Sequence, residues 1–245
     1  FSSFKIFFTF LKLKPNLLIG YGGYTSVIPC LVGKFFGTDY LIHEQNAVMG
    51  RANKFLERFS SFSLISFKNT IPQSIYPNKR IFCGVPLRDE FVYNKNLNYN
   101  YNKKNAFNIL IFGGSLGSEF FSTKIPKALC CLDKDIKKQL NITHQVTACK
   151  KKLVKKNYLS NNISSNVDTF FNDIYKHYIK ADLIICRAGG TTLAEIISLK
   201  IPSIIIPFQN SLDDHQSINS DIISKNKVGW VINEKEFKLD EFNLI

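Results

Sequence analysis

The stretch Asp182–Asn219, DLIICRAGGTTLAEIISLKIPSIIIPFQNSLDDHQSIN, decides the predicted fold. Leu183–Cys186 is a short continuous apolar run, which is typical of a parallel strand buried on both faces, and a glycine turn breaks it. A helix is predicted to start at Thr191 or Thr192, and Ser203–Ile206 is predicted to be a second buried strand. This order of strand, helix and strand predicts an α/β sheet with parallel strands.

The glycine turn Arg187-Ala-Gly-Gly lies at the carboxyl end of the first strand, where open α/β sheets bind ligands. Because the first N–H groups of the following helix lack partners within the helix, we expect an anion site there, most simply for a phosphate. A polar loop that opens at Pro207 follows the second strand, so two neighbouring loops are expected to converge on one crevice. The polar side chains of that loop are those of Asp213, Asp214, His215, Gln216 and Asn219.

Apolar residues at positions 4, 7, 8 and 11 have helical spacing and predict that Phe1–Leu13 is a helix that faces the core. The next predicted elements are the strand Asn16–Ile19, the helix Val27–Phe36, the strand Tyr40–Ile42, the helix Ala47–Phe59 and the strand Phe62–Ser66. The turn Gly20-Tyr-Gly-Gly precedes the second helix, although its glycines serve equally well to let the chain turn tightly. His43-Glu-Gln-Asn follows a buried strand, and four polar side chains in succession are costly to leave unpaired.

Phe91–Asn105 is polar, rich in asparagine and without a clear period, which predicts a linker between two halves. Ile109–Phe112 is then a predicted strand, and a second glycine turn, Gly113-Gly-Ser-Leu-Gly, opens a helix at about Ser118. The segments predicted to follow are a helix and a strand in Asp135–Thr147, a basic solvated stretch at Lys150–Asn157, and a strand end with a helix in Val167–Tyr178. We therefore predict two Rossmann-like α/β domains, residues 1–90 and 106–245, joined by the linker 91–105.

Basic residues outnumber acidic residues by 32 to 19, which gives a formal net charge of +13. Such a surplus suits nucleic acid, an anionic membrane surface or a phosphorylated substrate as the partner. The surplus is mostly lysine, and a compositional drift towards lysine and asparagine would produce it too. No nucleic-acid-binding motif is present, so no nucleic-acid partner is predicted.

The six cysteines have neither a CxxC pair nor metal-ligand spacing, and several lie in apolar runs, which predicts reduced, buried thiols in a cytosolic protein and no metal site. No apolar segment of the sequence reaches the ~20 residues that a membrane span requires. Phe4–Leu13 is too short for a span and contains Lys5 and Lys12, and no signal-peptide cleavage site follows it.

Three motifs of the central stretch closely resemble the donor-binding half of the MurG family. They are R-A-G-G-T-T-L-A-E (187–195), I-P-S-I-I-I-P-F (201–208) and D-D-H-Q-S-I-N (213–219). Gly22-Gly23-Tyr24, His43–Asn46 and Asn53 match further positions of the family in the first half. The family consists of peptidoglycan glycosyltransferases, and the resemblance covers nearly all of the chain.

The resemblance implies a glycosyltransferase-B fold, in which two Rossmann-like domains face a cleft. It implies an inverting hexosyltransferase that moves N-acetylglucosamine from UDP-N-acetylglucosamine to the C4 hydroxyl of undecaprenyl-pyrophosphoryl-muramoyl-pentapeptide, which converts lipid I to lipid II. Helix N-termini would stabilise the departing UDP, so no cofactor and no metal are expected. The implied location is peripheral, against the anionic cytoplasmic face of the bacterial plasma membrane.

The resemblance also implies which residues contact the donor. Carried over by position, they are Asn46, Arg88, Ser115, Phe171, Gly190, Thr191, Thr192, Leu193, Ala194, Glu195 and Gln216. His43 and Glu44 are the candidates for the catalytic base. From the sequence alone, a lone arginine at a domain edge such as Arg88 is more often part of a surface ion pair. Glu195 would either hold the ribose hydroxyls or, three residues after Thr192, close a capping box.

Members of the family begin with a glycine-rich turn that ends in histidine, and this sequence has no such turn. We therefore expect an internal fragment or a curtailed reading frame, with the first domain truncated at its N-terminal side and the second at its C-terminal side. Two other functions stay open, namely a UDP-N-acetylglucosamine 2-epimerase and a remnant that binds a nucleotide sugar without turnover. A dinucleotide-dependent oxidoreductase is disfavoured, because Gly113-Gly-Ser-Leu-Gly lacks the G-x-G-x-x-G spacing.

Overall fold

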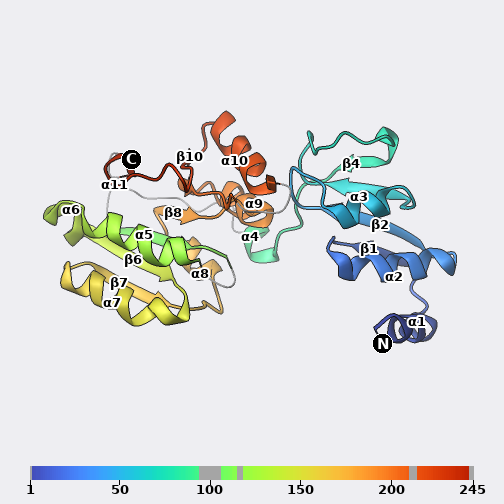
Figure 1. The fold of residues 1–245 in the computed structure, drawn as a ribbon, viewed down its shortest axis with the longest axis horizontal. Helices are drawn as coiled ribbons and strands as arrows, with labels where there is room; N and C mark the ends of the chain where they lie inside the picture. The colour runs from blue at the N-terminus through green and yellow to red at the C-terminus, as the bar shows by residue number, and fades with distance from the viewer. Residues whose placement is uncertain (1, 94–105, 115–117, 210–213, 243–245) are drawn as a thin grey trace. The chain divides into compact units, whose positions relative to one another are not determined.

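The computed structural model describes residues 2–93, 106–114, 118–209 and 214–242, which group into two compact units (Figure 1). The first unit comprises Phe1–Pro86 and Asn210–Asn219, and the second comprises Leu87–Gln209 and Ser220–Ile245. Each unit has its own sheet of parallel strands, which confirms the predicted α/β class.

The first unit is built on a four-stranded parallel sheet in the order β1-β2-β3-β4. Its elements are α1 (Ser2–Leu13), β1 (Leu17–Gly20), α2 (Tyr24–Phe35), β2 (Asp39–Glu44), α3 (Arg51–Glu57), β3 (Phe62–Ile65), the 3-10 turn η1 (Pro77–Lys79) and β4 (Arg80–Phe82). The predicted alternation of helix and strand is confirmed, with several shifted boundaries. Helix α2 begins at Tyr24 instead of Val27. Strand β2 continues through His43 and Glu44, and α3 begins at Arg51 instead of Ala47.

Helix α1 exists as predicted, but the prediction of which face meets the core was wrong. Phe4 and Phe8 are 75% and 65% exposed, whereas Phe10 is 9% exposed. The ring of Phe10 stacks on Phe36 at the end of α2, with the ring centroids 5.1 Å apart. Apolar residues occur on both sides of this helix, so the spacing predicted a helix without identifying its buried side.

The second unit is built on a six-stranded parallel sheet in the order β10-β9-β8-β5-β6-β7. Its elements are α4 (Asp89–Tyr93), β5 (Phe107–Phe112), α5 (Glu119–Cys130), α6 (Lys134–Gln139), β6 (Leu140–Gln145), the 3-10 turn η3 (Ala148–Lys150), α7 (Lys151–Ser160), β7 (Ser164–Asp168), α8 (Tyr175–Tyr178), β8 (Leu183–Cys186), α9 (Gly190–Leu199), β9 (Ser203–Ile205), β10 (Trp230–Val231) and α11 (Leu239–Phe242). Helix α10 (His215–Lys225) is divided, because its residues up to Asn219 group with the first unit and those from Ser220 with the second. Counted within this unit, the strands run 6-5-4-1-2-3, which is the order of the doubly wound Rossmann sheet.

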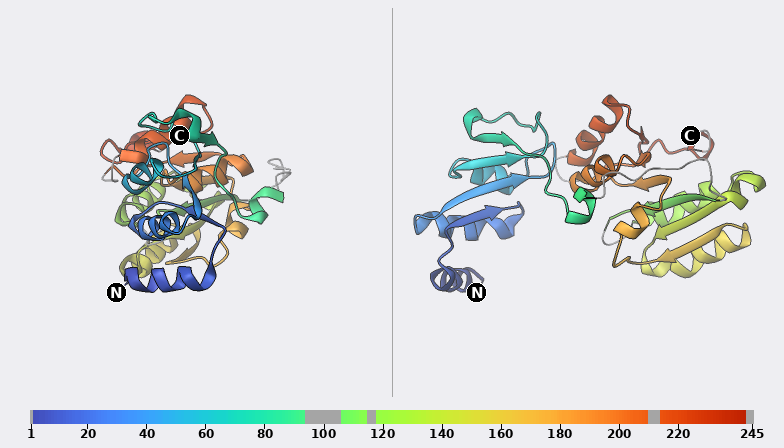
Figure 2. Two further views of the ribbon diagram at one scale, coloured as in Figure 1. Left: turned by 90° about the vertical axis from the view of Figure 1, so that its right-hand side faces the viewer. Right: turned by 180° about the vertical axis from the view of Figure 1, so that it is seen from behind.

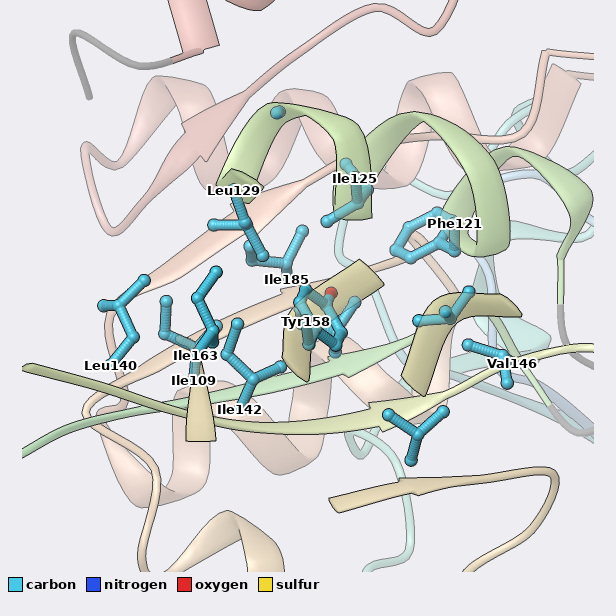
Figure 3. Packing of buried hydrophobic residues seen from close by; sticks show 14 of the residues in the cluster. Ile109, Phe121, Ile125, Leu129, Leu140, Ile142, Val146, Tyr158, Ile163 and Ile185 are labelled. Carbon is cyan, nitrogen blue, oxygen red and sulfur yellow. The ribbon is translucent and has the colours of Figure 1, made fainter. Parts of the chain in front are cut away.

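Both faces of this second sheet are covered, which explains the continuous apolar runs of its strands. Along β5, Ile109 and Ile111 point into one buried cluster and Leu110 and Phe112 into another. Helix α5 covers the first cluster with side chains such as Phe121, as Figure 3 shows, and α9 contributes to the second. Figure 2 shows the same layers from two other directions.

Two predicted segments of the second unit differ in the structure. The predicted linker starts at Phe91, yet Phe91 lies in α4 and is fully buried against Tyr175 and Tyr178. The rest of that linker, from residue 94 to 105, lies outside the described residues. The basic stretch predicted to be solvated is helix α7, which buries Val154 and Tyr158 and leaves most of its lysines exposed. These two apolar residues stand four positions apart, so they share one face of the helix.

His144 on β6 is fully buried in the second unit, with its Nδ1 atom 2.8 Å from the hydroxyl of Tyr158. Burial lowers the pKa of this imidazole to about 3, because the charged ring would lose its hydration. In the unfolded chain the ring should have its ordinary pKa of about 6.5. Between these two values the unfolded chain binds a proton that the folded protein excludes, so folding stability must fall as the pH falls.

We predict that His144→Phe flattens this dependence. Between about pH 6 and about pH 4, the free energy of unfolding of the wild type should fall by up to about 1.4 kcal/mol per pH unit more than that of the variant. Urea unfolding at a series of pH values measures the difference. As the control, His177→Gln changes a histidine that is only partly buried and should keep most of the wild-type slope. Parallel curves for the wild type and His144→Phe would contradict the prediction.

Candidate functional site

The strand order of the second unit reverses between β5 and β8, because β5 pairs with β6 on one side and with β8 on the other. In open α/β sheets, ligands bind outside the carboxyl ends of the strands at such a reversal. The two loops at this point follow Phe112 and Cys186. Both are the glycine turns that the sequence singled out.

The first loop needs glycine for steric reasons. A Cβ atom on Gly113 would lie 2.6 Å from the Cβ of Ser118, which is the N-cap of α5, and Gly114 has a φ of +105°. Glycine therefore lets the chain pass close to the start of α5. The predicted donor contact of Ser115 lies outside the described residues.

The second loop leads into α9, which begins at Gly190, one residue before the predicted start. Its N-cap is Gly189, which has no side chain to accept a hydrogen bond, and the first bond within the helix runs from the Leu193 N–H to the Gly189 carbonyl at 2.9 Å. The N–H groups of Gly190, Thr191 and Thr192 therefore have no partner within α9. Together with the positive end of the helix dipole, they suit an anion.

The capping-box interpretation of Glu195 is wrong, because the N-cap is Gly189 instead of Thr192. The Glu195 carboxylate lies in the second turn of α9 and is 8% exposed. Its Oε1 accepts a hydrogen bond from Arg88 Nη2 at 3.1 Å, and its Oε2 accepts one from the Tyr178 hydroxyl at 3.0 Å. Arg88 forms the expected surface ion pair, with Glu90, and a second ion pair with Glu195, another residue of the predicted donor site.

We call Arg88, Phe91, Tyr178 and Glu195 the Glu195 cluster. The Arg88 guanidinium lies over the Phe91 ring, with its Cζ 4.7 Å from the centroid, and the Phe91 and Tyr178 rings are 5.3 Å apart. Burial raises the pKa of Glu195, although hydrogen bonds from Tyr178 and the charge of Arg88 oppose that shift. Burial, and next the Glu195 charge, raise the pKa of Tyr178 well above its usual value, so its hydroxyl stays a hydrogen-bond donor.

Arg187 also lies at this edge of the sheet. In the sequence it was only part of the R-A-G-G-T-T-L-A-E motif, and no role was predicted for its side chain. Its Nη1 lies within hydrogen-bonding distance of the carbonyls of Ile206 and Pro207, both at 3.2 Å, and of the Glu234 carboxylate at 2.5 Å. Its Nη2 donates to Ser118 Oγ at 2.9 Å. The buried guanidinium thus joins the loops that follow β5, β8 and β9. The sequence offers two signals for such a role. Arginine is rare in this chain, which has only five, and Arg187 directly follows a predicted strand.

The first unit holds the two candidates for the catalytic base in structural roles. Both ring nitrogens of His43 are engaged, with Nε2 2.9 Å from the Gly84 carbonyl and Nδ1 3.1 Å from Gln45 Nε2. The Glu44 carboxylate accepts hydrogen bonds from four groups of the following residues, which are Asn46 N and Nδ2, Gly50 N and Asn53 Nδ2. His43 and Glu44 are 1% and 3% exposed, so neither presents a lone pair to a substrate.

The remaining predicted residues are spread over both units. Asn46 and Gln216 belong to the first unit, and Gln216 lies in α10 instead of a loop. Phe171 follows β7, and its ring centroid lies 4.6 Å from that of His177. Leu193 is 1% exposed in the core, so only its backbone could meet a ligand, and Ala194 is half-buried beside it.

The prediction that the cysteines are buried was wrong for Cys83, Cys131 and Cys149, which are exposed. Within the ranges that the structure describes, no three His, Cys, Asp or Glu side chains gather as metal ligands would. In the same ranges, no helix has the length and apolar content to cross a bilayer.

Comparison with known proteins identifies the chain. The glycosyltransferase family 28 C-terminal domain matches residues 108–244, and the family 28 N-terminal domain matches residues 1–62. A relative from Nitrosospira multiformis, the UDP-N-acetylglucosamine–N-acetylmuramyl-(pentapeptide) pyrophosphoryl-undecaprenol N-acetylglucosamine transferase, is 33% identical over 87% of this chain. The chain spans 58% of that relative's length.

Two solved structures extend the comparison. The crystal structure of MurG from Acinetobacter baumannii superposes with a TM-score of 0.77 at 29% identity, over 99% of this chain and 68% of that one. The UDP-GlcNAc 2-epimerase of Methanocaldococcus jannaschii superposes with a TM-score of 0.62 at 15% identity, over 99% of this chain and 73% of that one. At that identity the epimerase shares the fold alone. The two family 28 domains together match most of the sequence, and the relatives are MurG transferases. The chain therefore belongs to glycosyltransferase family 28, within its MurG family.

Proposed function

We propose that this protein binds UDP-N-acetylglucosamine on its second unit and transfers N-acetylglucosamine, with inversion, to the C4 hydroxyl of the lipid-linked muramoyl-pentapeptide. This step of peptidoglycan synthesis would serve cell shape and division. The observation that carries the proposal is the arrangement at the strand-order reversal, where two glycine loops, the N-terminus of α9 and the Glu195 cluster belong to one edge of a family 28 domain.

The diphosphate is assigned to the N-terminus of α9. The N–H groups of Gly190, Thr191 and Thr192 lack partners within the helix, and Gly189 places no side chain over them. Negative charge grows on the diphosphate as the sugar departs, and fixed dipoles stabilise such charge without reorganising. This chain's own contribution to the leaving group is therefore electrostatic.

The ribose is assigned to Glu195. Its two oxygens already accept from Arg88 and Tyr178, but each carboxylate oxygen has a second lone pair. Two ribose hydroxyls can thus donate to the same carboxylate, which its neighbours hold in place. Hydrogen bonds to a charged group contribute about 1.5–3 kcal/mol each.

The sugar is assigned to the loop that begins at Pro207. Within it, Gln209 Oε1 is buried and has no hydrogen-bond partner among the described residues. A buried acceptor without a donor costs about 1–3 kcal/mol, and a sugar hydroxyl would satisfy it. The catalytic base stays unassigned, because the nitrogens of His43 and the oxygens of Glu44 are already engaged.

We also propose a peripheral position on an anionic membrane surface, through α1. Phe4 and Phe8 are exposed on this helix beside the exposed Lys5 and Lys12. Exposed rings can enter the interface while each lysine near an anionic surface contributes about 1 kcal/mol.

Glu195→Gln tests the ribose assignment. Glutamine keeps one oxygen that accepts hydrogen bonds and replaces the other oxygen with an NH2 group. This NH2 group faces an N–H of Arg88 or the hydroxyl of Tyr178, with which it cannot replace the hydrogen bond of the carboxylate. UDP binding should weaken by roughly 1.5–3 kcal/mol, measured by calorimetry, while stability changes by about 1 kcal/mol or less, because Arg88 is half exposed. Glu90→Gln is the matched control, since Glu90 pairs with Arg88 from the exposed side and should leave UDP binding unchanged. Normal UDP binding by folded Glu195→Gln would refute the assignment.

Donor selectivity tests the proposed reaction. The protein should bind UDP-N-acetylglucosamine about 10-fold more tightly than UDP-N-acetylgalactosamine, a difference of about 1.4 kcal/mol that one hydrogen bond can supply. Gln209→Leu should remove most of this preference and leave the affinity for UDP itself unchanged. Equal affinities in the wild type would contradict the proposal. Release of N-acetylmannosamine from the donor would instead identify a 2-epimerase.

A further inference from the structure

A hollow of about 730 Å³ lies within the second unit, at the end of α9 opposite to Gly190. Its apolar walls include Ile197, Pro202, Val228 and Trp230, which come from the ends of α9 and α10 and from the neighbouring strands. The volume falls in the range of about 300–1,000 Å³ that is usual for small-molecule sites. None of the residues assigned to the nucleotide sugar lines this hollow.

The hollow arises from the way the two helices end. Helix α9 closes with bonds from Lys200 N to Ile197 O and from Ile201 N to Ile196 O, at 3.2 and 3.3 Å. Helix α10 closes in the same manner, from Lys227 N to Ser224 O and from Val228 N to Ile223 O, at 3.1 and 3.2 Å. Both endings are Schellman motifs, in which the turning residue has positive φ.

Lysine occupies the turning position of both motifs, where glycine is usual. Lys200 and Lys227 have φ values of +56° and +53°, and both line the hollow. No aspartate or glutamate lines it, and neither lysine has an ion pair among the described residues. The hollow therefore combines apolar walls with two positive charges that form no ion pair within the described part of the chain.

The sheet edge supplies the remaining wall. A Cβ atom on Gly229 would lie 2.5 Å from the Ser203 carbonyl, so glycine allows the chain to pass close to β9. This approach places Trp230 opposite Ile204 on the edge strand. The Trp230 side chain remains 47% exposed, and it is the only tryptophan of the chain.

We propose that this hollow binds a single-chain amphiphile with an anionic head group, whose chain contacts the apolar walls and whose head lies between Lys200 and Lys227. Charge complementarity selects an anion, and the shortage of polar groups on the walls selects an acyl chain over a sugar or a nucleotide. The inference does not rest on the assigned donor site. A carboxylate head would mark a fatty acid, and a phosphate head would mark a lipid phosphate.

Fluorescence of Trp230 reads this site directly. Residues 1–245 are titrated with dodecanoate, dodecyl phosphate and dodecanol below their aggregation limits, with saturating UDP present so that the nucleotide site is occupied. We expect a saturable change with at least one anionic probe and clearly weaker binding of dodecanol. The tighter of the two anionic probes identifies the head group.

A pair of double variants separates the lysines of the site from general charge. The first double variant combines Lys200→Asn with Lys227→Asn, because asparagine tolerates positive φ. It should bind the anionic probes about 10-fold more weakly, since two partly exposed ion pairs contribute about 1.4 kcal/mol together. Lys225→Asn with Lys235→Asn removes the same charge outside the hollow and should bind as the wild type does. The inference is overturned if Trp230 shows no saturable change, if dodecanol binds as tightly as the anions, or if both double variants behave alike.

Discussion

The buried guanidinium of Arg187 is the interaction on which the binding edge of the second unit depends. A buried charge is tolerated only when its donors are paired, so Ser118, the carbonyls after β9 and Glu234 must all converge on one point. Three phenylalanine rings surround the same group, those of Phe120, Phe121 and Phe208. Residues that follow three different strands are thereby held together at this edge.

At this edge of the sheet, α9 carries two kinds of polar group that can form further hydrogen bonds with a ligand. The N–H groups at its start lack partners within the helix, and one turn later Glu195 holds a buried carboxylate whose pKa is raised by burial. Buried acids with a shifted pKa are frequent at functional sites. Arg88 and Tyr178 keep the carboxylate oriented, so a bound hydroxyl meets a group that does not need to reorganise.

The strands were predictable because both faces of a parallel sheet are buried, which leaves runs such as Leu183–Cys186 with little ambiguity. The helix faces were less predictable. In α1 apolar residues occur on both sides, and in α7 the lysines concealed the pair Val154 and Tyr158. At the site, local spacing identified the glycine turns, whereas Glu195 was assigned to the donor site from the resemblance to the MurG family. The one role that local spacing suggested for Glu195, the capping box, was wrong.

The partners of the site residues were not predictable in the same way. Tyr178 reaches Glu195 from 17 positions away and Arg88 from 107, and no local pattern encodes contacts at such separations. The polar cluster at His43–Asn46 was correctly expected to be paired, but its pairing is internal to the first unit, which removes the lone pairs that a catalytic base needs.

Amide chemical shifts report directly on whether the start of α9 receives the diphosphate. In a ¹⁵N-labelled sample of residues 1–245, added UDP should move the amide signals of Gly190, Thr191 and Thr192 more than those of Val228 and Trp230, which lie beyond the other end of the helix. The assignment of the diphosphate to the start of α9 would be contradicted if UDP bound without moving those three signals and the largest chemical-shift changes occurred elsewhere in the chain.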